Sequence, residues 1–134
     1  MSGTTHEYID GNLSVVGNLT VTGTQSQAGN LQVNGSTSTS AAGAVTLNNK
    51  AGIITTETIT TAAGATYTLT ISNSVATVGD HVYVSIFNNT NTVGIPVVTS
   101  ASCGAGTVVV KVANASITTA FNGSLKVDYL VVKN

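Results

Sequence analysis

Glycine recurs every six residues near the N-terminus, at positions 11, 17, 23, 29 and 35. Three of the four units that these glycines delimit read GNLSVV, GNLTVT and GNLQVN, so that Leu and Val stand two residues apart. Side chains two apart share one face of an extended segment. Glycine supplies the positive φ that a tight corner needs. Each hexad therefore predicts one very short strand with an apolar face, followed by a corner.

The small number of hexads indicates how the apolar face is buried. A repeat of this kind cannot bury its apolar face alone, and four units are too few for a single-chain β-helix. Three chains wound about a threefold axis would bring the same side chains together, and closed cyclic assembly is the usual form of such an interface. We therefore expect an intertwined, homotrimeric β-stalk over residues 11–35. Its expected trimer core is Leu13, Val15, Leu19, Val21, Leu31 and Val33.

The third hexad, GTQSQA, departs from the pattern. It keeps its glycine but places Gln25 and Gln27 where Leu and Val stand in the other units. Two interpretations are open. Either the Gln amides of three chains form a polar layer in the stalk, or the strand is interrupted here and loops outward.

Two segments flank the stalk. Residues 1–10 form a polar arm that we expect to contact a partner, through His6, Glu7, Tyr8, Ile9 and Asp10. Three copies of His6, with Glu7, could hold a metal ion on the threefold axis, but we favour a solvent-facing or partner-contacting histidine. Residues 36–52 contain a Ser/Thr run and two glycines, which predicts a linker and domain boundary; such linkers are usually flexible, although a stalk could carry the segment as a continuing strand.

The remainder of the chain, residues 53–134, predicts an antiparallel β-sandwich or barrel. Turn signals separate six apolar segments, which we expect to be strands at about 53–60, 65–73, 80–88, 95–102, 106–114 and 124–132. Alternation marks the core faces of three of these strands. These faces are Tyr67, Leu69 and Ile71; Val82, Val84 and Ile86; and Leu125, Val127, Tyr129 and Val131.

Composition supports an all-β protein and argues against several kinds of partner. Charged side chains make up 7% of the chain, against about a quarter in typical domains, and β-branched residues outnumber good helix formers. The cations are four lysines, and arginine is absent. Nucleic acids and anionic membrane surfaces are bound by clusters of such cations, so we expect neither partner. The N-terminus lacks the basic and apolar regions of a signal peptide, so we expect synthesis in the cytoplasm.

Candidate catalytic residues are few. Asp80 and His81 are consecutive in an expected strand and must point to opposite faces. Cys103, at a strand end, is read as a small buried hydrophobe, and Lys126 and Asp128 as a solvated pair of little energetic weight. Lys111 and Glu57 are read as solvated charges too. We find no phosphate-binding loop, metal-ligand spacing or nucleophile motif. The expectation is a structural protein with no enzymatic activity, metal or cofactor.

The GNLSVVGNLTVTG segment resembles the glycine-rich stalk repeats of trimeric bacteriophage fibre and decoration proteins. The stretch from NNKAGIITTETITTAAGATYTLT to NGSLKVDYLVVKN is similar to β-rich C-terminal modules of tailed-phage virion proteins. Together these segments cover about residues 11–134. The resemblance implies a trimeric virion protein, either a capsid decoration (cement) protein or a short fibre.

Length favours the first of these two classes. A receptor-binding fibre usually has a longer shaft or a dedicated attachment domain, whereas this chain has four hexads and a ten-residue arm. The resemblance then implies a homotrimer on the outer capsid surface, with the major capsid protein as partner and head stabilisation as function. The alternative is a fibre module that recognises a host surface, such as a glycan.

Overall fold

The structure is a computed structural model, and it describes residues 11, 13–24 and 35–134. The chain divides into two compact units, Met1–Gln32 and Val33–Asn134. The described residues contain strands, turns and bends but no helix. The second unit holds two four-stranded sheets, which agrees with the β-sandwich predicted from the alternating segments.

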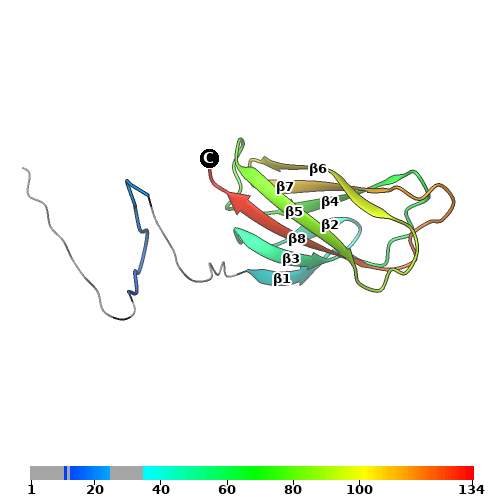
Figure 1. Cartoon of the computed structure of the whole chain (residues 1–134), viewed down its shortest axis with the longest axis horizontal. Helices are drawn as coiled ribbons and strands as arrows, with labels where there is room; N and C mark the ends of the chain where they lie inside the picture. The colour runs from blue at the N-terminus through cyan, green and yellow to red at the C-terminus, as the bar shows by residue number, and fades with distance from the viewer. Residues whose placement is uncertain (1–10, 12, 25–34) are drawn as a thin grey trace, which may run out of the picture. The chain divides into compact units, whose positions relative to one another are not determined.

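Sheet A has the strand order β1-β3-β8-β5. Strands β3 and β5 both pair antiparallel with the central β8, whereas β1 pairs parallel with β3. Figure 1 shows these four strands side by side, with β1 and β5 at the two edges. Their bounds are β1 Ser36–Thr39, β3 Ala51–Thr55, β5 His81–Asn88 and β8 Leu125–Val132.

Sheet B has the strand order β2-β4-β7-β6. Strand β7 pairs antiparallel with β4 and β6, and the short β2 pairs parallel with β4. The β6–β7 pairing shifts register between Val98 and Ser100, which inserts one extra residue at the edge of the sheet. The bounds are β2 Ala44–Thr46, β4 Thr66–Ser72, β6 Pro96–Gly104 and β7 Thr107–Asn114.

The core lies between the two sheets. Strand alternation points one set of side chains of each sheet inward, and the innermost strands β7 and β8 bury theirs completely or nearly so. Successive strands lie in alternate sheets, except for the β6–β7 hairpin. The buried apolar residues include Ile54, Val127, Tyr129 and Val131 from sheet A, Leu69, Ile71, Val108, Val110 and Val112 from sheet B, and Phe121 from the β7–β8 connection.

Five of the six predicted strands are confirmed to within two residues at their ends, whereas the strand predicted at 53–60 is β3, which ends at Thr55. The predicted core faces point inward. Two predictions need correction. The sheets are mixed and not purely antiparallel, because β1 and β2 each add a parallel edge. Residues 36–52 were predicted to be a linker, but they form β1, β2 and the start of β3 within the two sheets. Short Ser/Thr segments can serve as edge strands because an edge strand forms backbone hydrogen bonds with a neighbour on one side only.

The hexad segment shows no strand among its described residues, 11 and 13–24. Gly11 and Gly17 have φ of 122° and 117°, as predicted for corners, whereas Gly23 lies outside the positive-φ region. Gln25 and Gln27, for which a polar layer and an outward loop were both open, fall outside the described residues.

Candidate functional site

The carboxylate of Glu57 gathers hydrogen bonds from three parts of the sandwich. It lies just after β3, and Ser40 Oγ at the end of β1 donates to it. The backbone N–H of Gly43, in the turn between β1 and β2, donates to Oε1 over 2.8 Å. Tyr67 Oη on β4 lies 3.1 Å from both carboxylate oxygens. Glu57 therefore ties the β1–β2 segment to β3 and β4, a role that the reading as a solvated charge missed.

These contacts shift the pKa values of the groups in opposite directions. The pKa of Glu57 lies below its ordinary value. Burial alone would raise this pKa, but the hydrogen bonds from Ser40, Tyr67 and Gly43 have the larger combined effect. Burial raises the pKa of Tyr67 to about 12, with a further contribution from the Glu57 charge. Glu57 is thus ionised and Tyr67 is a hydrogen-bond donor at neutral pH. The hydrogen bonds hold the connected segments together. They do not suit proton transfer, because the two pKa values lie far apart on either side of neutral pH.

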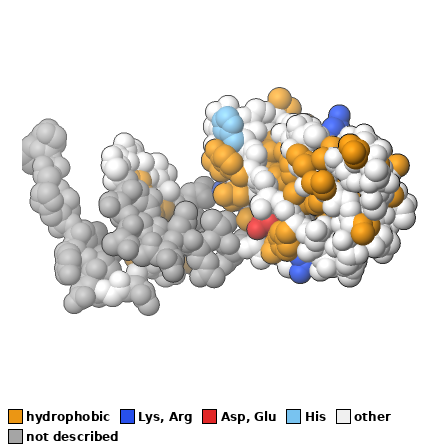
Figure 2. Space-filling model, turned by 45° about the vertical axis from the view of Figure 1, so that its right-hand side comes forward, with side chains coloured by type: hydrophobic (Ala, Val, Ile, Leu, Met, Phe, Trp, Pro, Cys, Tyr) orange, Lys and Arg blue, Asp and Glu red, His pale blue; other side chains and the backbone are white. Residues whose placement is uncertain are grey.

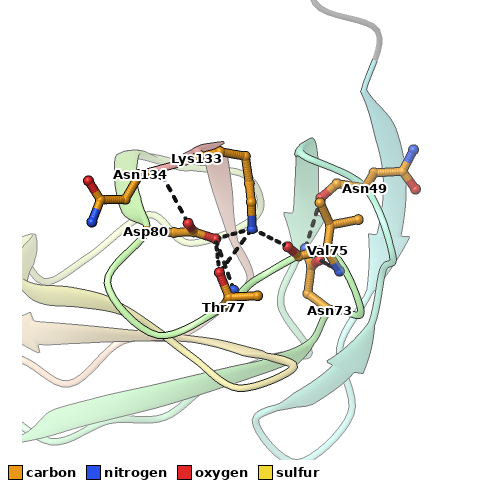
Figure 3. A network of polar contacts seen from close by, with 7 residues as sticks. All are labelled: Asn49, Asn73, Val75, Thr77, Asp80, Lys133 and Asn134. Carbon is orange, nitrogen blue, oxygen red and sulfur yellow. Dashed lines mark hydrogen bonds and ion pairs between the residues drawn. The ribbon is translucent and has the colours of Figure 1, made fainter. Parts of the chain in front are cut away.

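A second polar network fixes the C-terminal end of β8 (Figure 3). Lys133 Nζ forms an ion pair with Asp80 and donates to the carbonyl oxygen of Val75 over 2.8 Å. Asp80 also accepts hydrogen bonds from the backbone N–H groups of Thr77, at 2.9 Å, and Asn134, at 3.1 Å. The contact with Lys133 is the main reason that the pKa of Asp80 lies below its ordinary value. The network holds the β4–β5 connection against the last residues of the chain.

Asn114 organises the opposite end of the sandwich. Its side chain is fully buried at the end of β7. The amide donates to the carbonyl oxygens of Thr61 and Thr119 over 3.1 and 2.8 Å, and its oxygen accepts from the N–H groups of Ile95 and Ser116, both at 3.1 Å. One side chain therefore joins three connecting segments. A buried amide with both donors and its acceptor engaged is a structural element.

The outer faces of the two sheets differ in chemistry. In sheet B, hydroxyl side chains dominate β4, whose outward residues are Thr66, Thr68, Thr70 and Ser72. Sheet A carries Tyr83, Phe87 and Leu130 outward, together with Lys126 and Asp128. Two shallow hollows of about 250 and 270 Å³ lie on this face and share Asp128. Sheet A therefore carries the exposed aromatic side chains of the sandwich, whereas sheet B exposes Val97 on β6.

The predicted trimer-core residues that the structure describes are exposed in the single chain. Leu13 and Leu19 are 60% and 59% exposed, and Val15 and Val21 are 44% and 46% exposed. Val16, which the hexad pattern points the opposite way, is fully exposed. Leu31 and Val33 lie outside the described residues, as do the predicted arm contacts His6, Glu7, Tyr8, Ile9 and Asp10.

The other candidate residues are dispersed over the sandwich. Lys126 and Asp128 share the outer face of β8, but within residues 35–134 the ion pair that forms is Lys133–Asp80. Cys103 is half-buried on β6, and burial raises the pKa of its thiol. Over the described part of the chain, no three His, Cys, Asp or Glu side chains lie close enough to hold a metal ion. The same residues include no helix of the length and apolarity that crossing a bilayer requires.

Comparison with known proteins found no match among protein-family models, curated proteins or solved structures.

Proposed function

We propose that this chain is a homotrimeric structural protein of a virus particle, which binds the outer capsid surface and stabilises the head. The observation that carries the proposal is the exposure of regularly spaced leucines in the hexad segment. Leu13 and Leu19 are six residues apart, and each is about three-fifths exposed in the single chain. Exposed leucines that recur at the six-residue period of the sequence favour burial between copies of the same chain.

The polar clusters of the sandwich support a structural role. Glu57, Asp80 and Asn114 are each engaged by several hydrogen bonds that join separate segments. Groups held in this way stabilise a fold, because their donors and acceptors are already used. The outer face of β4 in sheet B carries hydroxyl side chains, which suit a protein that stands in solvent on a particle.

A trimer would bind a capsid through several contacts at once. The partner is the major capsid protein, and three linked sites raise the overall affinity well beyond that of one site. Contact with several capsid subunits would also oppose their separation under internal pressure. The location is the outer surface of the virion, after synthesis in the cytoplasm of the host.

The test is to mix the purified protein with undecorated, expanded capsids of the virus that encodes it. We expect saturable binding with a stoichiometry in multiples of three and an increase in the temperature at which the capsids open. A variant with Leu13, Leu19 and Leu31 replaced by Ser should bind more weakly, because it lacks the trimer contacts. Absence of binding by the unmodified protein would refute the proposal.

The second candidate is a fibre module that recognises a host surface. Tyr83 is 65% exposed and lies with Ser85, Asp128 and Leu130 around one of the hollows of sheet A. Aromatic rings beside hydroxyl and carboxylate groups suit carbohydrate recognition. Inhibition of virus adsorption by the free protein, with no binding to capsids, would favour this second function.

A further inference from the structure

Strand β5 is the open edge of the sandwich. An edge strand presents a row of unpaired backbone N–H and C=O groups, which another strand can pair with unless the edge is short, bulged or charged. Strands β1 and β2 have only four and three residues. Strand β6 begins with Pro96 and contains the register shift. Strand β5 has eight residues in unbroken register with β8, and it contains no proline, lysine, arginine or acidic residue.

The side chains of β5 are incompletely covered on both faces. On the outer face, Tyr83 and Phe87 are 65% and 44% exposed. On the inner face, Val82, Val84 and Ile86 are only half-buried, whereas the inward side chains of the neighbouring β8 are buried. Figure 2 shows hydrophobic side chains spread over the visible face of the sandwich, with few charged ones among them. A further strand beside β5 would cover apolar surface on both faces.

We propose that β5 pairs antiparallel with β5 of a second copy of the chain, about a twofold axis at Ser85. The two A sheets then form one continuous sheet across the contact. An antiparallel copy brings a carbonyl oxygen to each outward N–H group and an N–H group to each outward carbonyl, so the partial charges of the two edges are complementary. No formally charged side chain of β5 opposes the approach.

The side chains in this register complement each other as well. Ser85 lies opposite Ser85 of the second copy, Tyr83 lies opposite the second copy's Phe87, and Phe87 lies opposite the second copy's Tyr83. Val84 meets Ile86 of the second copy on the inner face. Aromatic and β-branched pairs of this kind stabilise neighbouring antiparallel strands. One sequence thus supplies both halves of the contact, which favours a second copy over a different protein.

This contact does not depend on the stalk. A twofold axis joins two copies of the sandwich, whether each copy is free or belongs to a separate trimer. The inference therefore concerns a second surface and stands apart from the proposed function.

Disulfide trapping in the full chain tests the pairing directly. In a Cys103→Ala background, Ser85→Cys places two thiols on the twofold axis, where Cα atoms of opposed residues lie about 4.5–5.5 Å apart, within disulfide range. Ser102→Cys is the matched control, because Ser102 is also exposed on an edge strand. Mild oxidation should give covalent dimers of Ser85→Cys about tenfold faster or more, because the opposed thiols have a high effective concentration. Equal rates for both variants, or no dimer of Ser85→Cys, would overturn the proposal.

Solution mass provides an independent measurement. The full chain with Leu13, Leu19 and Leu31 replaced by Ser removes the expected stalk contacts and should sediment as a dimer. Adding Tyr83→Lys should convert it to a monomer, whereas Thr68→Lys on the outer face of sheet B should not. A monomer before Tyr83→Lys is added would contradict pairing through β5. If trimers survive the leucine replacements while Ser85→Cys still forms covalent dimers, the proposed trimeric stalk is contradicted and the β5 pairing is not.

Discussion

The Glu57 side chain binds the short β1–β2 segment to the rest of the sandwich. Strands β1 and β2 together contain seven residues, each strand with one hydrogen-bonded neighbour. Their connecting turn donates to Glu57 through Gly43, and the preceding Ser40 donates through its hydroxyl. Charge-assisted hydrogen bonds are stronger than neutral ones. The carboxylate therefore stabilises a segment that has little apolar surface of its own to bury.

Glu57→Gln should destabilise the sandwich by about 1–2 kcal/mol at neutral pH, because a neutral amide accepts these hydrogen bonds less strongly. The lowered pKa of Glu57 means that its stabilisation is present above the ordinary value of 4.5 and is lost as pH falls from there through the lowered pKa. The difference between the variant and the unmodified protein should therefore shrink in acid. Denaturant unfolding at pH 7 and below pH 4 measures both quantities.

Asp128→Asn is the control for this experiment. Asp128 is an exposed residue on the outer face of β8, so its loss should change stability by less than about 0.5 kcal/mol. An equal effect of the two substitutions would show that the net charge of the protein, and not the hydrogen bonds of Glu57, determines the pH dependence.

At the scale of elements, the turn between β1 and β2 requires positive φ at two consecutive residues. Ala41 and Ala44 exchange two backbone hydrogen bonds of 3.0 Å, and the two residues between them, Ala42 and Gly43, both have positive φ. This is the pattern of a type I′ turn. The turn carries the chain from sheet A to sheet B, so its geometry determines where both short strands lie.

Gly43→Ala should destabilise the protein more than Gly64→Ala. Both glycines have nearly the same φ, 75° and 74°, so a Cβ atom costs each about 1–2 kcal/mol of backbone strain. At Gly43 the new Cβ would also lie 2.7 Å from the carbonyl oxygen of Thr68, whereas nothing lies within 4 Å at Gly64. We expect an additional cost of about 1–3 kcal/mol at Gly43. Thermal unfolding of the two variants gives the comparison, and equal losses would contradict the close packing of the turn on β4.

At the scale of the whole molecule, the described residues of the two units differ in the burial of their apolar side chains. The sandwich has a contiguous core within Val33–Asn134. In the hexad segment, the described Leu and Val side chains are exposed in a single chain. Stability of the sandwich and assembly of the chain should therefore respond to different substitutions.

Replacing Leu13, Leu19 and Leu31 by Ser should abolish the expected trimer and leave the unfolding temperature of the sandwich unchanged. Leu69→Ala, at a fully buried position, should instead lower the free energy of unfolding by about 2–5 kcal/mol and leave the trimer intact below the unfolding temperature. Light scattering and calorimetry measure the two effects. A trimer that survives the three serine substitutions would mean that the sandwich itself assembles.

The sequence alone was sufficient for six of the eight strands of the sandwich and for the core faces of β4, β5 and β8. Alternation in Leu125, Val127, Tyr129 and Val131 determines which face of β8 is buried, because consecutive strand residues point to opposite sides. Glycine and asparagine also mark turns between strands from the sequence alone, because their preference for turn conformations is a property of the residues themselves. The apolar face of the hexads stays a prediction, because residues 11 and 13–24 form no strand.

Only the tertiary structure decided which strands are neighbours and what the polar residues do. Strand β8 lies between β3 and β5, far from both along the chain, and no local pattern specifies that order. Ser40, Glu57 and Tyr67 come from separate segments, so their hydrogen bonds exist only after the sheets have packed. The same holds for Ser36–Thr39, whose polar composition predicts a linker but whose backbone pairs with β3. Local periodicity determines faces and turns, whereas partners depend on contacts between residues distant in sequence.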